Sequence, residues 1–427
     1  MLMALSGELS RTLKSVQGVA DARVQVVLPD NSPLLDRSQW SAVIASFLGW
    51  TLDAFDFFLM VFMLKSIATE FGTDVKHVAL AVTLTLAARP FGALLFGWLA
   101  DKYGRRPILM ADILLYSVFE FASAFAPSLA ALIVIRTLFG FAMGGEWGIG
   151  ASLVMETIPP KTRGIISGLL QEGYACGYLL ASIAYYFLFD VIGWRGMFML
   201  GILPALLVVV IRLWVKESPA FEKTRHDPDR PNPFTLLLRH WKTALYVIVL
   251  MTAFNFFSHG TQDLFPTFLQ TEHKFDTHTV GVVTAIMNVG AITGGLIFGA
   301  LSDRFSRRWA IIAAALLALP IIPLWAFSHT AAMLAAGAFL IQVAVQGAWG
   351  VVPVHINELA PDGARGTFPG FAYQAGNLIA SVNATLQAGI AEASSYSHAL
   401  ALVCGVTAVV LAVWTFVGPE RKGVELR

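Results

Sequence analysis

Long apolar stretches separated by short polar segments form the pattern of the chain from Arg37 onward. Each stretch is about 20 residues long, the length that an α-helix needs to cross the hydrocarbon core of a bilayer. The pattern predicts twelve membrane-spanning helices, at residues 40–64, 77–99, 107–126, 129–154, 164–189, 194–215, 242–270, 278–301, 309–328, 331–356, 366–391 and 397–417. We therefore expect an all-α membrane protein that crosses the lipid bilayer twelve times.

Composition agrees with a membrane protein. Hydrophobic residues make up 56% of the chain and charged residues 13%, with a mean hydropathy of +0.68, whereas a soluble domain carries about 25% charged residues. The net charge of +1 gives no electrostatic reason for a nucleic-acid partner, and we expect none. The two cysteines, Cys176 and Cys404, lie in separate apolar stretches, so we expect no disulfide framework and no metal site.

A connection rich in proline and charge divides the chain into two halves of six predicted spans. This linker, residues 216–241, lies between an N-terminal bundle at 37–215 and a C-terminal bundle at 242–418, which a tail at 419–427 follows. Of the 29 lysines and arginines, 23 fall on the same side of the membrane as the N-terminus. Basic residues mark cytoplasmic loops, so we predict cytoplasmic termini in a multi-pass protein of the cell (inner) membrane.

The two halves repeat each other at a constant offset of 202 residues. The segment Gly97–Arg106 corresponds to Gly299–Arg308, and the segment Trp147–Gly164 corresponds to Trp349–Gly366. One offset that holds across two separate regions indicates an internal repeat. Because each half has an even number of spans, the repeat is parallel, about an axis along the membrane normal.

The repeated loop resembles the signature of the major facilitator superfamily, Gly-x-x-x-Asp-(Lys/Arg)-x-Gly-Arg-Arg, and the resemblance covers residues 38–420. It implies two pseudo-symmetric six-helix halves with a cytoplasmic gate held by charge pairing. The candidate gate residues are Gly97, Asp101, Arg105, Arg106, Asp303, Arg307 and Arg308. The second copy has Ser306 where the first has Gly104, which predicts a less tight turn there.

Several charged residues fall inside predicted spans, where lipid makes them costly. In the first half these include Asp53, Asp56, Arg89, Arg136, Glu146 and Glu172. The second half has lost most of them: the positions that correspond to Asp53, Arg89, Arg136, Glu146 and Glu172 hold Asn255, Ala291, Ala338, Ala348 and Gln374. A scaffold role would be needed in both halves, so these charges indicate a special site.

Arg89 is the first candidate for binding an anionic substrate. It lies near mid-depth, and its planar guanidinium matches a carboxylate; the alternative is a salt bridge to Asp53 or Asp56. For Arg136, the resemblance to proton-coupled members of the superfamily implies pairing with a carboxylate of the first span. Asp53 or Asp56 would then bind the proton, and Asp53 is slightly favoured.

A polar stripe lies on the seventh span, where Asn255, His259 and Gln262 share one helix face with Asp263 beside them. The pattern Asn-x-x-Ser-His-x-Thr-Gln-Asp-x-x-x-Thr is similar to that of the fungal lactate/pyruvate permeases and their bacterial relatives, within the sialate:proton symporters. All seven positions match: Asn255, Ser258, His259, Thr261, Gln262, Asp263 and Thr267. The segments Gln171–Tyr174 and Tyr373–Asn377 also resemble that family.

This second resemblance implies a proton-coupled symporter of a small monocarboxylate, such as lactate or pyruvate, that works by alternating access. Candidate substrate-binding residues are Arg89, Tyr174, Asn255, His259, Gln262, Gln374 and Asn377. Candidate proton-coupling residues are Asp53, Asp56, Arg136, Glu172 and Asp263. We expect the protein not to be an enzyme, because no nucleophile–base or metal-ligand spacing is evident. We also expect a monomer that needs no cofactor. The alternatives are a sialic acid or dicarboxylate:proton symporter and a carboxylate receptor that does not transport.

Residues 1–36 differ from the rest of the chain. The pattern predicts an amphipathic helix over Ser6–Val16 and a short strand over Ala22–Leu28, without an apolar run long enough to span a membrane. The run Gly7–Pro29 resembles part of the ring-building proteins of flagellar and type III secretion basal bodies. It is too short to fold alone, so we expect a remnant without function; the alternative is a small interaction tail.

Overall fold

The computed structural model describes residues 35–224 and 232–426. The predicted helix over Ser6–Val16 and strand over Ala22–Leu28 lie outside these residues. The chain from Arg37 onward forms one compact unit, and every regular element of its described part is helical.

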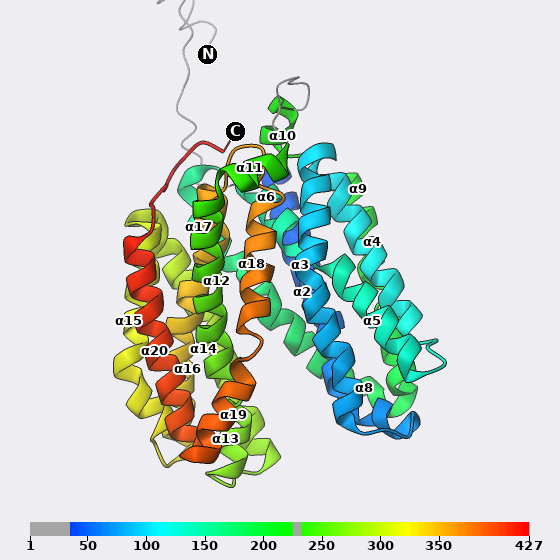
Figure 1. The fold of residues 1–427 in the computed structure, drawn as a ribbon, viewed down its shortest axis with the longest axis vertical. Coiled ribbons are helices and arrows are strands. Elements are labelled where there is room, and N and C mark those ends of the chain that lie inside the picture. The colour runs from blue at the N-terminus through cyan, green and yellow to red at the C-terminus, as the bar shows by residue number, and fades with distance from the viewer. Residues whose placement is uncertain (1–34, 225–231, 427) are drawn as a thin grey trace, which may run out of the picture. The chain divides into compact units, whose positions relative to one another are not determined.

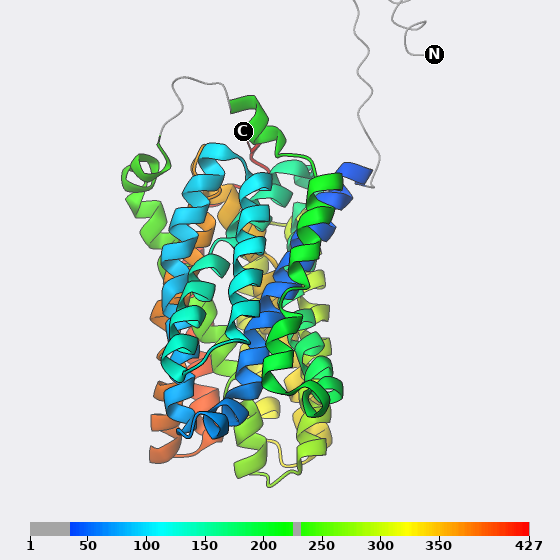
Figure 2. The same cartoon turned by 90° about the vertical axis from the view of Figure 1, so that its right-hand side faces the viewer.

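The first half of this unit consists of eight α-helices and one 3₁₀ turn. The helices are α2 (Arg37–Glu70), α3 (Val75–Tyr103), α4 (Arg105–Ser123), α5 (Leu129–Met143), α6 (Glu146–Thr157), α7 (Arg163–Gln171), α8 (Gly173–Leu200) and α9 (Pro204–Trp214). The turn, η1 (Pro160–Thr162), precedes α7. Figure 2 shows this half from its own side, with α2 in blue alongside the cyan and green helices.

Two short helices, α10 (Pro219–Thr224) and α11 (Pro233–Arg239), belong to the linker between the halves. The second half contains α12 (Trp241–Gln262), α13 (Phe265–Thr271), α14 (Thr277–Arg304), α15 (Arg307–Ala326), α16 (Ala331–Gly350), α17 (Val352–Leu359), α18 (Phe368–Ala380), α19 (Asn383–Ala393) and α20 (Tyr396–Val417).

All twelve predicted spans are helical, and six of them are interrupted. Spans four, five, seven, ten and eleven are the helix pairs α5–α6, α7–α8, α12–α13, α16–α17 and α18–α19. Within α8, Gly193 has a φ of 62° and ends the fifth span; the sixth then runs through Gly201–Leu203 into α9. Nine stretches of the described chain are long and apolar enough to cross a membrane by themselves. The other three predicted spans are not among these nine as separate stretches. The third, α4, carries several charges. The fifth and sixth form one continuous stretch, Pro160–Trp214, and the eleventh is divided into the short helices α18 and α19.

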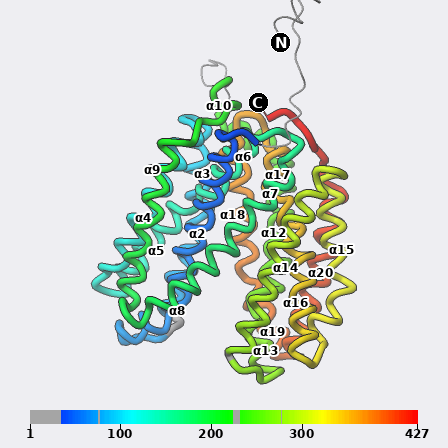
Figure 3. Tube along the Cα trace, turned by 180° about the vertical axis from the view of Figure 1, so that it is seen from behind, coloured from blue at the N-terminus to red at the C-terminus, as the bar shows by residue number. Residues whose placement is uncertain are grey.

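The two halves meet through several helix pairs, most extensively α3 with α18 and α7 with α14. Figures 1 and 3 show the halves close together where α3 leads into α4 and α14 into α15, and diverging toward the opposite end. We call the first of these the gate end. Glycines permit the approach: a Cβ on Gly97 would lie 2.6 Å from the Gly366 oxygen, and one on Gly168 would lie 2.2 Å from the Gly295 oxygen. Small residues let helix backbones come this close.

Candidate functional site

At the gate end, Asp101 of α3 binds the start of α18 in the other half. Its carboxylate accepts hydrogen bonds from the backbone amides of Gly366 and Thr367, both at 2.8 Å, and from the Thr367 hydroxyl at 2.6 Å. Unsatisfied amides and the helix dipole make a helix N-terminus a favourable place for an anion. The buried carboxylate therefore joins the two halves.

Asp303 of α14 makes the symmetric contact with the first half. It accepts hydrogen bonds from the backbone amides of Gly164 at 2.8 Å and Ile165 at 3.0 Å, at the start of α7. Gly164 and Ile165 precede Gly366 and Thr367 by the repeat offset of 202 residues. The contact between the halves at the gate end is thus built twice, once from each half.

An arginine supports each of these aspartates. Arg105 lies 3.0 Å from both Asp101 and Glu156, and Arg307 lies 2.8 Å from Asp303. Arg307 also pairs with Glu358 at 3.1 Å, where Glu358 is the repeat counterpart of Glu156. Each arginine is nearly fully buried, and a buried charge needs partners such as these.

A carboxylate accepts a hydrogen bond from the backbone amide of the second arginine of each loop. Glu217 accepts hydrogen bonds from the backbone amides of Arg105 and Arg106, and Glu420 accepts one from that of Arg308 at 3.0 Å. Burial raises the pKa of Glu217 in spite of these bonds. Burial would also raise the pKa of Glu420, but hydrogen bonds from the Ser306 hydroxyl and the Arg308 amide lower it overall.

The two loops differ where Ser306 replaces glycine, as expected. Gly104 has a φ of 114°, which favours glycine, and a Cβ there would lie 2.3 Å from Glu217. Ser306 has an extended φ of −154°, and its hydroxyl caps α15 at the Trp309 amide, 3.2 Å away. The serine is accommodated because the second loop uses a side-chain cap in place of a left-handed turn.

The chain that follows α20 crosses the gate. Lys422 donates to the Phe305 oxygen at 2.9 Å, and the Gly423 amide donates to Glu358 at 3.2 Å. Arg163, of the first half, donates to the Val424 oxygen at 2.8 Å. The tail thus adds a further contact between the halves.

We expect Asp101→Asn to weaken the contact with the start of α18, and Asp303→Asn to weaken the contact with the start of α7. Hydrogen bonds to a charged acceptor contribute about 1 kcal/mol more than neutral ones. Amide hydrogen exchange should therefore quicken about fivefold at Gly366 and Thr367 in the first variant, and at Gly164 in the second. Each variant is the control for the other. Equal exchange in both variants and the native protein would contradict this role.

Further from the gate end, five aromatic side chains from both halves form a cluster. Tyr373 of α18 lies 4.7 Å from Trp147, 5.7 Å from Trp349 and 6.4 Å from Trp50, measured between ring centroids. Trp50 also lies 5.5 Å from Tyr174 of α8. Aromatic rings at these distances attract one another. The cluster thus joins α2, α6 and α8 of the first half to α16 and α18 of the second.

Arg89 of α3 is buried beside the first span. Its Nη2 lies 3.5 Å from the Asp53 carboxylate and 2.8 Å from the Met143 sulfur, and the guanidinium faces the Phe57 ring at 5.3 Å. Its Nε has no partner among the described residues. Both alternatives for Arg89 are thus compatible with the geometry: it contacts Asp53, yet it retains an unused donor.

Arg136 pairs with a different carboxylate from the one expected. Its guanidinium is bonded to Glu120 of α4 and stacks on the Phe139 ring at 3.9 Å. Neither oxygen of Asp56 has a hydrogen-bond partner in the described chain. The direct ion pair of Arg136 is thus with Glu120 and not with a first-span aspartate, because α4 presents Glu120 directly to α5. Arg136 still interacts electrostatically with Asp56, and its role in proton coupling stays a prediction.

The seventh-span stripe brings three predicted residues together. His259 Nδ1 lies 3.1 Å from Asp263 one turn later on α12, and the Asn377 side chain of α18 interacts with the same ring. About a third of each side chain of the His259–Asp263 pair is exposed. Tyr174 is within electrostatic reach of both Arg89 and Asp263.

The amides of the stripe are oriented differently. Gln262 donates to Gln342 of α16 at 3.0 Å, and Gln342 donates in turn to the Thr261 hydroxyl. The buried Asn255 donates to the Met251 oxygen in its own helix at 2.8 Å. Gln262 is thus tied to α16 and stands apart from the His259 group, although the sequence places both on one face.

Glu172 and Gln374 are both buried. Glu172 lies at the break between α7 and α8, and Gln374 lies within α18. Glu172 interrupts the α7–α8 pair, and a Cβ on Gly295 of α14 would lie 2.2 Å from its Oε1. That oxygen and Oε1 of Gln374 have no partner among the residues described. Glu172 therefore places a carboxyl oxygen that has no partner in the described chain against the other half.

Sequence reasoning singled out neither Trp50 nor Tyr373 as a site residue. The aromatic cluster contains Trp147 and Trp349, which are equivalent at the repeat offset. That pairing of two large side chains, one in each half, is a signal that could have indicated an aromatic contact at the pseudo-symmetry axis. In the described residues, no group of three metal-ligating side chains is close enough to hold an ion.

Comparison with protein families identifies the chain. Residues 42–276, more than half of it, match the model of the Major Facilitator Superfamily, and residues 238–422 match that of the sugar (and other) transporters. Residues 1–48 match the model described as "Secretory protein of YscJ/FliF RBM domain", in agreement with the resemblance of Gly7–Pro29.

Individual proteins agree with the family models. A putative metabolite transport protein of Haemophilus influenzae is 31% identical over 91% of this chain and 98% of its own length. A carboxylic acid transporter protein homolog of Saccharomyces cerevisiae is 26% identical over 90% of this chain and 68% of its own. The solved proton:xylose symporter XylE superposes with a TM-score of 0.73 at 18% identity, covering 91% of this chain and 98% of that one. The chain therefore belongs to the Major Facilitator Superfamily and is a multi-pass membrane transporter.

Proposed function

We propose that the protein is a symporter that moves a small monocarboxylate, such as lactate or pyruvate, together with a proton by alternating access. The observation that carries this proposal is the environment of Arg89. A buried guanidinium with one long contact to Asp53, at 3.5 Å, and an unpartnered Nε is suited to receive the fork of a carboxylate. The charge of the bound acid would then compete with Asp53 for the same cation.

That competition supplies a coupling mechanism. Asp53 is buried, and its second oxygen has no partner in the described chain. When the substrate carboxylate takes the Arg89 donors, an ionised Asp53 would be left buried without its cation, which costs several kcal/mol. Binding a proton removes this cost, so substrate and proton favour each other's binding. In this scheme Asp56 and Glu172 are further buried carboxyl groups that can hold a proton.

The gate geometry agrees with one step of alternating access. The halves are joined at the end that carries Asp101 and Asp303, which charge distribution predicts to be cytoplasmic. This conformation would then face outward, with His259 and Asp263 reached from the outside. The partly exposed His259–Asp263 pair and Asn377 form the wall opposite Arg89 and take part in substrate passage.

A monocarboxylate fits better than a dicarboxylate. A second carboxylate would need a second available cation near the site, and Arg136 is already bonded to Glu120. The similarity to the yeast carboxylic acid transporter homolog favours an organic acid. A sialic acid symporter has the same single carboxylate, so substrate size separates it from the main proposal.

The test is a substrate screen with the purified full chain in proteoliposomes under an imposed pH gradient. Lactate, pyruvate, succinate and sialic acid are compared as labelled solutes. We expect gradient-driven accumulation of lactate or pyruvate, collapsed by a protonophore. Accumulation of sialic acid alone would select the second candidate, and saturable binding without uptake would indicate a receptor.

We expect His259→Gln to weaken substrate binding and leave proton coupling intact. The variant loses the ring that joins Asp263 to Asn377, so KM for lactate should rise about tenfold, as for the loss of one charge-assisted hydrogen bond. His278→Gln, at an exposed position of α14, is the matched control. Loss of pH-driven accumulation with unchanged counterflow would instead move the proton site to His259.

A further inference from the structure

Glu146 is a buried carboxyl group that the mechanism above leaves without a role. It begins α6 beside the break at Gly144–Gly145, its exposure is 0%, and neither of its oxygens has a partner in the described chain. Its repeat counterpart is Ala348. A membrane protein keeps such a group only for a functional reason, because an unpaired carboxyl in a dry interior is costly.

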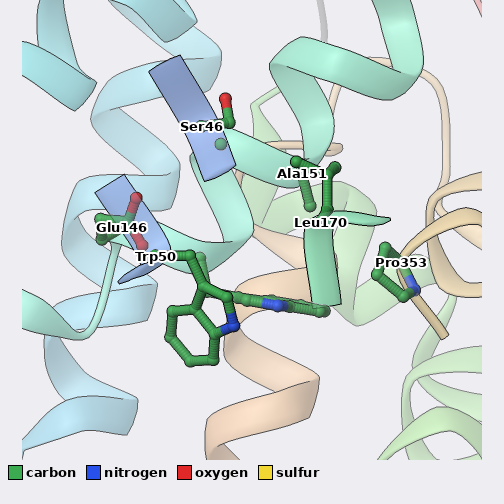
Figure 4. Close-up of a pocket in the computed structure, with 8 residues that line it drawn as sticks. Ser46, Trp50, Glu146, Ala151, Leu170 and Pro353 are labelled. Atoms are coloured by element: carbon green, nitrogen blue, oxygen red, sulfur yellow. The ribbon is translucent and has the colours of Figure 1, made fainter. Parts of the chain in front are cut away.

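The carboxyl group borders a small cavity. This space of about 10 Å³ is lined by Ser46, Trp50, Glu146 and Trp147, with Leu170 and Pro353 closing it, and Figure 4 shows these side chains around it. The Ser46 hydroxyl and the Trp50 Nε1 are also buried without a hydrogen-bond partner in the described chain. A cavity of this volume holds about one water molecule, which needs two to four polar partners. The three side chains supply them.

The backbone leaves room for this arrangement. A Cβ on Gly49 would lie 2.4 Å from Glu146 Oε1, so the glycine permits the carboxyl to reach α2. Asp53, Gly49 and Ser46 follow one another along α2 toward the gate end. At 1.5 Å per residue, the step from Asp53 to Ser46 covers about 10 Å. Glu146 therefore stands between the Arg89–Asp53 pair and the gate.

The groups that face Glu146 come from several helices. Its electrostatic partners are Asp53 on α2, Asp112 on α4 and Arg89 on α3, and the Tyr116 ring of α4 is affected by it in turn. Both oxygens of Asp112 and the Tyr116 hydroxyl are buried without a partner in the described chain. One cation thus faces three carboxyl groups. Ionising all three at once would be costly.

We propose that Glu146 and the water site beside it form the inner station of the proton path, on which the proton moves from Asp53 toward the cytoplasm. The proton leaves the Asp53 carboxyl and is taken up by the Glu146 carboxylate, so the total charge is unchanged. Only Pro353, on α17, belongs to the second half. When the halves separate at the gate, Pro353 withdraws, water enters, and Glu146 gives its proton to water. This proposal rests on the proton coupling of the proposed function.

The test compares Glu146→Gln with the native chain in proteoliposomes, with lactate as the probe. The amide keeps the shape of the protonated acid and cannot release a proton. We expect pH-driven lactate accumulation to be lost, while lactate counterflow without a pH gradient stays within about twofold of the native rate. Glu392→Gln, the same change at an exposed position, should leave both rates unchanged. Undiminished pH-driven accumulation in Glu146→Gln would overturn the proposal.

A second measurement does not depend on the substrate. The infrared band of buried protonated carboxyl groups, which shifts in deuterated buffer, should lose a component in Glu146→Gln and change its pH dependence in Glu146→Asp. An identical band in all three proteins would refute the assignment. If the native chain shows no pH-driven uptake of any acid, the proposed function fails, and the infrared band still decides whether Glu146 binds a proton. The Asp variant also decides the matter if the Gln variant does not reach the membrane.

Discussion

Replacing Arg89 by glutamine should abolish saturable uptake of lactate while the protein remains folded in the membrane. Arg89 combines a buried position with the unpartnered Nε described above. Removing one partner of a buried charge pair costs about 2–5 kcal/mol, which corresponds to a loss in affinity of at least about thirtyfold. Glutamine keeps hydrogen-bonding capacity but supplies neither the charge nor the fork.

The design needs a control that separates binding from folding. Arg195→Gln removes an arginine whose partner, Glu70, lies 2.8 Å away at a partly exposed position. Exposed ion pairs contribute about 0–1 kcal/mol, so uptake by this variant should stay near native. Thermal unfolding in detergent checks that both variants fold. Native KM and maximal rate in the Arg89 variant would remove Arg89 from the substrate site.

Asp53→Asn should uncouple transport from the pH gradient. The amide mimics the protonated acid, so the proton would no longer be needed to release Arg89 for the substrate. We expect lactate counterflow to persist and accumulation driven by the pH gradient to fall to the equilibrium level. Internal pH reported by an entrapped dye should remain constant during uptake, whereas in the native protein it should fall.

Two further variants make this result specific. Asp190→Asn, at an exposed position of α8 shortly before the break at Gly193, should behave as native. Asp56→Asn tests the neighbouring candidate, whose oxygens have no partner in the described chain. If Asp56→Asn loses gradient-driven accumulation while Asp53→Asn keeps it, the proton site belongs to Asp56, and the competition for Arg89 is not the coupling step.

The fold class and the paired loops at the gate end could be predicted from the sequence alone for identifiable reasons. Spans are visible because lipid demands about 20 consecutive apolar residues wherever the chain crosses it. The paired loops can be recognised because the same motif occurs in both copies of the repeat, at Gly97–Arg106 and Gly299–Arg308. Hydrophobic periodicity and a fixed repeat offset can both be recognised in the sequence itself, because neither depends on which helices pack against each other.

The partners of buried side chains depended on tertiary structure. The sequence indicated that Arg136 was costly in lipid, but not that α4 would present Glu120 to it. It placed Gln262 and His259 on one helix face, yet Gln262 reaches α16 and His259 interacts with α18. A helix face fixes only a direction, and the neighbour in that direction is set by packing between helices distant in sequence.

The sequence by itself therefore determined which charged residues lie within the membrane spans. It also determined the two repeated six-helix halves that carry them. What only the tertiary structure decided is which charges are satisfied. Asp101 and Asp303 are saturated by helix N-termini, whereas Glu146 has no partner in the described chain. The physical reason is that burial cost follows from residue type and hydropathy, while its compensation requires atoms within about 3 Å of one another, and those come from remote parts of the chain.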